Sequence, residues 1–157
     1  MAVNVNLGCG PVRFDGYLGF DIQPGPTVDV VGDFTKGLPW RESSVDNVAA
    51  YDFIEHIHDK VYTLREIYRV LKPGGLLHIQ VPDAEVGCGA FRDPTHVSFW
   101  CSQSFMDIYM APGPFHPGRY HYAVEHLAVT EVVDSCRWVI TRLRAVKAEP
   151  PSLPSLP

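Results

Sequence analysis

The sequence has few cysteines, no long apolar run and no excess of basic charge. Its four cysteines, Cys9, Cys88, Cys101 and Cys136, form no Cys-X-X-Cys pair, and no histidine stands at zinc-finger spacing. We therefore expect reduced thiols, and neither a disulfide framework nor a structural zinc site. The apolar runs fall far short of the ~20 residues that cross a bilayer, which predicts a soluble chain.

Other absences narrow the class further. No basic segment followed by an apolar core and a cleavage site is visible near the start, so we expect a cytoplasmic protein. The formal net charge is −5 and the pI is near 5.7. This balance disfavours a large phosphate-binding surface, although a local basic patch of Arg137, Arg142, Arg144 and Lys147 could exist. The sequence contains no internal repeat.

Length and composition fit a globular protein of one domain. The 157 residues are 46% hydrophobic and 20% charged, close to ordinary globular values. A chain of this size buries about 70% of its unfolded surface, which is enough for a hydrophobic core. We place this domain at residues 1–149, with residues 150–157, rich in proline, as a disordered tail.

Short apolar runs in the first half predict parallel β-strands. These runs are Val3 to Leu7, Tyr17 to Ile22, Val28 to Val31 and Val45 to Tyr51. The link from the first run to the second, Gly8 to Gly16, is shorter than a parallel crossover normally requires. Either a helix has shrunk to a turn there, or the strand assignment fails.

A helix and a further strand follow. Apolar residues recur every three or four positions from Val61 to Leu71, which predicts an amphipathic helix. Lys72 suits the terminal carbonyls, and Pro73 with the following glycines ends the helix and turns the chain into a strand at Leu76 to Val81.

The last half changes character. Residues 84–122 are rich in glycine, proline, histidine and aromatics and read as an elaborated loop region around one short helix, Ser102 to Met110, or as a satellite aromatic core. Two β-rich runs then follow, Ala123 to Val133 and Trp138 to Val146, which are consistent with an antiparallel hairpin at the edge of the sheet.

The order of motifs resembles one family. A strand runs into Gly8-Cys9-Gly10, an acid at Asp21 closes the second strand, Gly32-Asp33-Phe34 follows the third, and Val70-Leu-Lys-Pro-Gly-Gly75 precedes the fifth. This order resembles that of the class I S-adenosylmethionine-dependent methyltransferases, and most closely that of small members of the type 11 methyltransferase group. The resemblance implies a trimmed Rossmann-like α/β fold, with a mostly parallel seven-stranded sheet, an antiparallel C-terminal hairpin, and residues 84–122 as an insert on the acceptor side.

The resemblance also implies a cofactor site for S-adenosylmethionine. The glycine loop would pass beneath the methionine portion, Asp21 would grip the ribose, and Asp33 would meet the adenine amino group. The implied cofactor-binding residues are Gly8, Cys9, Gly10, Asp21, Ile22, Asp33, Phe34 and Tyr51. Two plainer readings remain, because Asp21 could merely cap a turn and Asp33 could form an Asx turn.

The chain departs from the family pattern at the glycine loop. Asn4 or Asn6 stands where an acid usually precedes the loop, and Pro11 follows Gly10 directly. The loop is therefore expected to grip its ligand less firmly. The missing third glycine of Gly-X-Gly-X-X-Gly also weighs against a dinucleotide-binding dehydrogenase.

Two histidines are candidate catalytic residues. Methyl transfer needs a base only when the acceptor is a hydroxyl or a protonated amine. Ligand crevices of such sheets open at the carboxyl ends of the strands, where Tyr51, Asp52, His56, Asp83 and Glu85 lie. The segment Asp93-Pro-Thr-His96 resembles one in small relatives, so we expect His96 to be the base or to position the acceptor, with His56 second. Structural roles for both histidines stay open.

A metal site is the less favoured reading. The chain has seven histidines, and Glu85, Asp93 and Glu125 could join them, but the spacing matches no defined motif. His56 and His58 would face different ways on a helix, so we expect no metal.

The sequence therefore predicts methyl transfer from S-adenosylmethionine to an oxygen or nitrogen of a small-molecule or saccharide acceptor. Nucleic acid and membrane partners are not expected, and the edge hairpin permits a homodimer. Two rivals remain: a non-catalytic module that binds the cofactor or its demethylated product, and an enzyme that cleaves the cofactor.

Overall fold

The computed structural model describes residues 1–86, 89–109, 122–130 and 136–147. The predicted tail at 150–157 and the stretch 131–133 of a predicted strand lie outside these residues. The described elements are β1 (Asn4–Leu7), β2 (Leu18–Asp21), β3 (Val30–Val31), the 3₁₀ helix η1 (Phe34–Lys36), β4 (Val45–Tyr51), the 3₁₀ helix η2 (Ile54–His56), α1 (Lys60–Val70), β5 (Leu71–Pro82), α2 (Gly89–Arg92), α3 (Ser102–Tyr109), β6 (Tyr122–Val129) and β7 (Trp138–Ala145).

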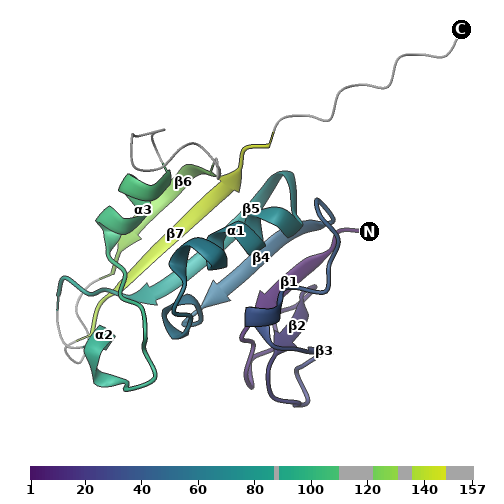
Figure 1. Cartoon of the computed structure of the whole chain (residues 1–157), viewed down its shortest axis with the longest axis horizontal. Coiled ribbons are helices and arrows are strands. Elements are labelled where there is room, and N and C mark those ends of the chain that lie inside the picture. The colour runs from purple at the N-terminus through teal and green to yellow at the C-terminus, as the bar shows by residue number, and fades with distance from the viewer. Residues whose placement is uncertain (87–88, 110–121, 131–135, 148–157) are drawn as a thin grey trace, which may run out of the picture.

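The strands form one seven-stranded sheet in the order β3-β2-β1-β4-β5-β7-β6 (Figure 1). The pairs β3–β2, β2–β1, β1–β4 and β4–β5 are parallel. The pairs β5–β7 and β7–β6 are antiparallel. This arrangement confirms the predicted Rossmann-like sheet with its antiparallel C-terminal hairpin.

The short links beside β2 are made of turns. Between β1 and β2 the N–H of Val12 donates to the carbonyl of Cys9 at 2.9 Å, and that of Tyr17 donates to Phe14 at 3.1 Å. The parallel register Val5↔Leu18 is nevertheless kept. The helix that usually makes this crossover is thus reduced to turns, and the strand assignment holds. The third strand is shorter than predicted, because the N–H of Val28 bonds the carbonyl of Gly25 in a turn.

Helix α1 begins and ends for identifiable reasons. The carboxylate of Asp59 caps its start by accepting the N–H of Tyr62 at 2.8 Å. At its end, the backbone N–H groups of Ser43 and Ser44 donate to the carbonyls of Arg69 and Val70, each at 2.9 Å. The expected role of Lys72 at these carbonyls is wrong: its ammonium group binds the carboxylate of Asp46 at 2.7 Å.

Strand β5 begins earlier than the sequence indicates. Leu71 already pairs with Val45, and the register then shifts before Asn47 pairs with Leu76. Gly74, with φ of 76°, provides the left-handed turn within this irregular stretch. Pro73 and Gly74 therefore interrupt the strand without ending it.

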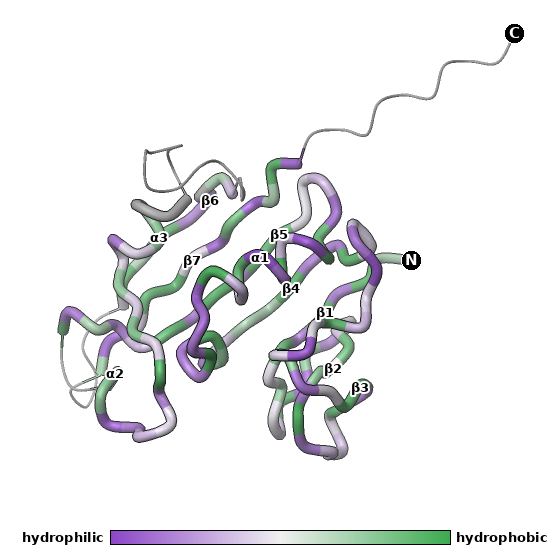
Figure 2. Tube along the Cα trace, in the orientation of Figure 1, coloured by the Kyte–Doolittle hydropathy of each residue, from purple (hydrophilic) through white to green (hydrophobic). Residues whose placement is uncertain are grey.

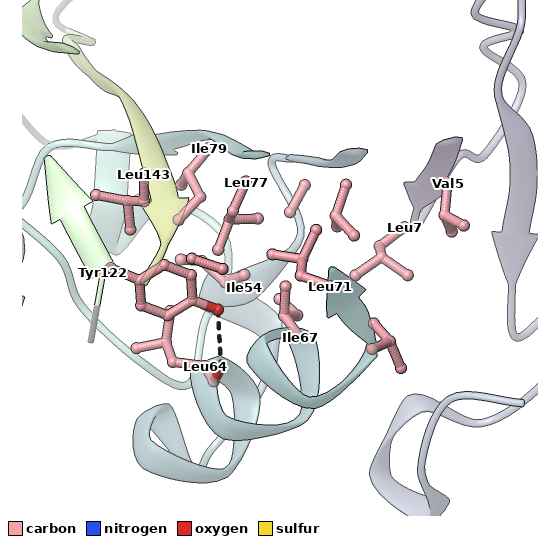
Figure 3. Packing of buried hydrophobic residues seen from close by; sticks show 14 of the residues in the cluster. Val5, Leu7, Ile54, Leu64, Ile67, Leu71, Leu77, Ile79, Tyr122 and Leu143 are labelled. Atoms are coloured by element: carbon pink, nitrogen blue, oxygen red, sulfur yellow. Dashed lines mark hydrogen bonds between the residues drawn. The ribbon is translucent and has the colours of Figure 1, made fainter. Parts of the chain in front are cut away.

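The core lies between α1 and the covered face of the sheet. Leu64 and Ile67 of α1 face Leu77 and Ile79 of β5, and all four are at most 1% exposed (Figure 3). Each such side chain contributes roughly 1.5–3 kcal/mol through burial. The hydroxyl of Tyr122 donates to the carbonyl of Leu64 at 3.1 Å, which joins β6 to α1 across this core.

The predicted aromatic satellite core is in part an extension of the main one. Trp100 and Phe105 are buried, stack with ring centroids 5.3 Å apart, and belong to the same cluster as the residues of α1 and β5. Phe91 and Phe99 also stack, but both are exposed.

The alternating side chains of the strands turn a more polar surface to the opposite side of the sheet. Along β7, buried and more exposed residues alternate, with Val139 and Leu143 buried and Arg142 and Arg144 exposed, and the end of the strand alternates in hydropathy as well (Figure 2). Among the described helices, none has the length and apolar character needed to pass through a membrane.

Candidate functional site

The glycine loop follows β1 at the carboxyl end of the strand. Gly8 and Gly10 have φ values of 61° and 47°, which favour glycine. A Cβ added to Gly8 would lie 2.5 Å from Cδ2 of Phe53, whereas one added to Gly10 would meet nothing within 4 Å. The loop thus packs on Phe53 at one glycine and faces open space at the other.

The acid that ends β2 is bound to this loop. The N–H of Gly10 donates to Oδ2 of Asp21 at 2.9 Å, and the N–H of Gln23 donates to Oδ1 at 3.0 Å. Each carboxylate oxygen keeps capacity for a further donor. The neighbouring side chain, Ile22, is 62% exposed. The structure therefore brings the glycine loop, Asp21 and an exposed apolar side chain together.

Cys9 between the two glycines is buried. Its thiol lies 3.7 Å from the carbonyl of Thr27, within hydrogen-bonding reach of sulfur. Burial raises the pKa of this thiol, and the charge of Asp21 adds to the effect. A thiol held in its protonated form is a packing group and a poor nucleophile.

Asp33 and Phe34 are placed at η1. Oδ1 of Asp33 accepts the N–H of Thr35 at 2.9 Å and its hydroxyl at 2.7 Å, and these bonds lower the pKa of the carboxyl. The Asx turn expected as the alternative for Asp33 is thus present, while Oδ2 is 3.5 Å from the ammonium of Lys36. Phe34 is only 4% exposed and lies edge-on to Phe53 and Tyr62.

The end of β4 carries two polar residues. Tyr51 is 38% exposed and lies edge-on to Phe14, with ring centroids 5.5 Å apart. Asp52 has φ of 48°, in the left-handed region. Its carboxylate accepts from Gln80 at 3.1 Å and from the indole of Trp138 at 3.2 Å, which links the end of β4 to β5 and β7.

The two candidate histidines lie side by side although they are far apart in the sequence. The rings of His56, at the end of η2, and His96 are 4.9 Å apart between centroids. Backbone bonds hold the two segments together, because the N–H groups of Val97 and Ser98 both donate to the carbonyl of Glu55 at 2.9 Å.

Each histidine is oriented through Nδ1. Nδ1 of His96 lies 2.9 Å from the carbonyl of Ala90, and Nδ1 of His56 lies 3.2 Å from the carbonyl of Thr95. A carbonyl only accepts, so these bonds place the proton on Nδ1 and leave a lone pair on Nε2. Asp93 fixes the turn by accepting the N–H and the hydroxyl of Thr95 at 2.8 and 2.6 Å.

Glu55 lies beside this pair. The residue is 2% exposed, and neither carboxylate oxygen has a hydrogen-bond partner among the described residues. Burial, with smaller contributions from the charges of Asp52 and Asp93, raises the pKa of this carboxyl to about 8. The sequence indicated no role for Glu55, which lies in η2 between buried Ile54 and His56.

Asp83, another acid at the carboxyl edge of the sheet, has an ion-pair partner, which Glu55 lacks among the described residues. Asp83 is completely buried and is paired with Arg137, whose Nε lies 2.6 Å from Oδ2. The N–H of Glu85 donates to Oδ1 of Asp83 at 2.9 Å. Asp83 therefore has a structural partner. No sequence pattern indicates this pair, because Arg137 belongs to the distant connection between β6 and β7.

Residues 5–79 match the family described as a methyltransferase domain. A protein of Mycolicibacterium smegmatis described as a probable S-adenosylmethionine-dependent methyltransferase is 36% identical over 58 residues, which are 37% of this chain and 23% of that protein. A chloroplastic 2-methyl-6-phytyl-1,4-hydroquinone methyltransferase of Oryza sativa is 31% identical over 83 residues, 53% of this chain and 22% of that protein. The matches thus span about a fifth of the length of these relatives.

Solved structures share the fold at low identity. The YcgJ protein of Bacillus subtilis has a TM-score of 0.66 at 12% identity, with 94% of this chain and 93% of that chain covered. A 16S rRNA (adenine(1408)-N(1))-methyltransferase of Catenulisporales acidiphilia, solved with S-adenosylmethionine, has a TM-score of 0.62 at 15% identity and covers 96% and 88%.

The fold, the matched domain and the relatives agree. Residues 5–79, from β1 into β5, match the methyltransferase domain. Over this segment the chain is similar to S-adenosylmethionine-dependent methyltransferases, and its sheet has the fold of the methyltransferases among the solved structures.

Proposed function

We propose that the protein transfers a methyl group from S-adenosylmethionine to an oxygen or nitrogen atom of a small-molecule or saccharide acceptor. The observation that carries this proposal is the 2.9 Å bond from the N–H of Gly10 to Asp21. It joins the glycine loop and the acid at the carboxyl ends of adjacent parallel strands, where ligands of such sheets bind.

The residues present fit the cofactor. Asp21 has free acceptor capacity for ribose hydroxyls, exposed Ile22 offers an apolar surface to the purine, and the open side of Gly10 lets a ligand approach the backbone. Oδ2 of Asp33, 3.5 Å from the ammonium of Lys36, has a further lone pair for the adenine amino group, and Tyr51 is exposed at the neighbouring strand end. Phe34 supports Phe53 beneath Gly8 and acts through it. When bound, S-adenosylmethionine supplies an electrophilic methyl group on sulfur.

His96 and His56 are the groups that accept the acceptor's proton. The Nδ1 bonds of both rings leave Nε2 unprotonated, which is the form required of a base. His56 lies in η2 directly after β4, and the backbone bonds to Glu55 hold the segment of His96 against it. The acceptor then lies beside residues 93–98 of the insert.

The charge of the chain supports a small acceptor. A net charge of −5 opposes binding of polyphosphate chains. The plant relative is named for a small hydroquinone, whereas one structural neighbour is named for ribosomal RNA, so the fold itself does not choose between them.

Ligand-induced thermal stabilisation tests the cofactor site. At S-adenosylhomocysteine concentrations ~100 times Kd, mass action stabilises the fold by about 2.7 kcal/mol. This corresponds to a rise in Tm of roughly 5–10 °C for a domain of this size. In Asp21→Ala most of this rise should vanish when each protein is compared with its own ligand-free form. Asp15 is an exposed acid in the link between β1 and β2. Asp15→Ala is therefore the matched control and should keep the full rise.

Two results would contradict the proposal: stabilisation by a nicotinamide dinucleotide in place of S-adenosylhomocysteine, or an unchanged rise in Asp21→Ala. Incubation with S-adenosylmethionine alone separates the rivals, because a cleaving enzyme releases methylthioadenosine or hydrolysis products and a transferase consumes the cofactor only once an acceptor is added. An inert binder consumes none in either case. The fold does host other chemistry, since the [4+2]-cyclase SpnF has a TM-score of 0.64 to this chain at 14% identity.

A further inference from the structure

The buried carboxylate of Glu55 has no partner that explains its burial. The residue is 2% exposed, and neither carboxylate oxygen has a hydrogen-bond donor among the described residues. A buried polar group without a partner costs free energy, and a buried charge costs much more. Such a position is normally kept when something else pairs with the group: a cation, a proton or a ligand.

The two histidines beside it are arranged as metal ligands usually are. Nδ1 of each ring is held by a backbone carbonyl, of Ala90 for His96 and of Thr95 for His56. The hydroxyl of Thr95 donates to Asp93 and accepts from Nδ1 of His56, which fixes the same tautomer again. Histidines that bind metals almost always donate their other ring N–H in this way, which orients the ring and raises its basicity.

The three side chains converge. One ligand atom from each of Glu55, His56 and His96 lies within 4.8 Å of the others. Ligand atoms around a tetrahedral ion with bonds of ~2.1 Å lie ~3.4 Å apart, so shifts of up to ~1 Å complete the site. Oδ2 of Asp93 lies 3.9 Å from Nε2 of His96 and adds negative charge nearby.

We propose that Glu55, His56 and His96 bind one divalent first-row transition-metal ion. Two imidazole nitrogens and one carboxylate oxygen are the donor set of open zinc sites, so Zn²⁺ suits these residues best, whereas Mg²⁺ prefers oxygen ligands alone. Sequence spacing does not reveal this group, because the histidines come from two distant segments and Glu55 faces inward.

Three protein ligands leave positions for other molecules. The cluster follows β4 at the carboxyl edge of the sheet. The acceptor of the proposed methyl transfer lies at the same edge. With the ion bound, Nε2 of both histidines is occupied and no longer takes the acceptor's proton. If the proposed methyl transfer holds, the ion would instead lower the pKa of a bound acceptor oxygen, whose proton passes to water. The binding of the ion itself does not depend on that function.

Titration with Co²⁺, a spectroscopic substitute for Zn²⁺, tests the site in the full chain. The protein is stripped with a chelator, kept reduced without added thiol and titrated in the absence of any nucleoside. We expect one equivalent of Co²⁺ to give visible ligand-field absorption, which one equivalent of Zn²⁺ abolishes and Mg²⁺ does not. His96→Ala and Glu55→Gln should each weaken binding at least ~10-fold.

The controls make the test specific. His126→Ala removes an exposed histidine of β6 outside the cluster and should bind Co²⁺ like the wild-type chain. Glu55→Gln keeps the side-chain shape, and circular dichroism verifies that each variant is folded. Three results would each overturn the proposal. These are the absence of one bound equivalent of Co²⁺, full affinity for Co²⁺ in both Glu55→Gln and His96→Ala, and a sulfur-to-cobalt charge-transfer band. Stabilisation by S-adenosylhomocysteine is measured separately, so loss of either result leaves the other interpretable.

Discussion

The two halves of the sheet hold their polar groups in different ways. In the first half, β1 to β3, the carboxylates of Asp21 and Asp29 accept backbone N–H groups, from Gly10 and Gly19 respectively. In the second half, β4 to β7, Asp83 depends on the side chain of Arg137, and Glu55 has no donor among the described residues. Asp29 also pairs with the side chain of Arg13, but Asp21 at the proposed cofactor site is held by the backbone N–H groups of Gly10 and Gln23. Backbone donors come with the fold, whereas the buried acids of the second half need a particular side chain or a ligand.

Removing the partner of Asp83 gives the largest expected effect. Arg137→Leu would leave a fully buried carboxylate without its counter-charge, much as Glu55 is now. Breaking a buried pair in this way costs about 3–5 kcal/mol. Urea unfolding measures the loss. The matched control in the first half is Arg13→Leu, which breaks the more exposed pair with Asp29 and should cost less than about 1 kcal/mol. Equal losses in the two variants would show that the halves do not differ.

A methyl group at Gly8 should disturb the first half. Gly8→Ala adds a left-handed alanine and a contact of 2.5 Å to Phe53. We expect a loss of about 2–4 kcal/mol in the free energy of unfolding. Gly16→Ala separates the two causes, because Gly16 has φ of 78° but open space around it, and should cost about 1–2 kcal/mol. Equal costs at both positions would mean that Phe53 moves aside freely.

Lowering the pH should change the free energy of unfolding through the second half before the first. This is the smallest of the three expected effects. Partial burial lowers the pKa of His78 on β5, and Arg142 adds to this while Glu125 opposes it. The folded state therefore resists protonation, and stability falls as the pH drops below the ordinary histidine value of 6.5. Glu55 contributes with the opposite sign over this range, because its pKa of about 8 in the folded protein lies above its ordinary value of 4.5, so the folded state gains stability as the pH falls. The contribution of His78 is therefore measured as a difference: between pH 7.5 and 5.5, urea unfolding should show wild type losing stability relative to His78→Gln.

Asp29 provides the contrast in the first half. Its bonds to Arg13 and to the N–H of Gly19 lower the pKa of the carboxyl, so its stabilisation is present above the ordinary value of 3.8 and is lost below it. Asp29→Asn should leave the change between pH 7.5 and 5.5 unaltered. Equal changes in wild type and His78→Gln, or a changed difference in Asp29→Asn, would contradict this division.

Much of the fold was predictable because the local signals agreed. A short apolar run marked β4, the three-to-four spacing marked α1, and Gly74 marked the turn before the main part of β5. The start of β5 at Leu71 was not predictable, because its pairing with Val45 depends on a tertiary contact. Lys72 likewise found Asp46 across the fold, whereas the helix end was capped by backbone groups.

The candidate site was predictable in part. The meeting of Gly10 and Asp21 followed from the rule that adjacent parallel strands end at one edge. The joining of His56 and His96 depended on how residues 93–98 dock on η2, which no periodicity shows. Phe34 is an apolar residue next to an acid, and sequence alone does not decide whether such a ring meets a ligand or, as here, the buried core.

The place of β7 has a consequence for the order in which the chain can fold. In the sheet β7 lies between β5 and β6, although it follows both in the sequence. During synthesis, Tyr122–Val129 must wait for Trp138–Ala145 before it can join the sheet, since β7 is the strand with which it pairs. Until then the edge of β5 stays open, and a nascent chain is most exposed to wrong strand pairing at this stage.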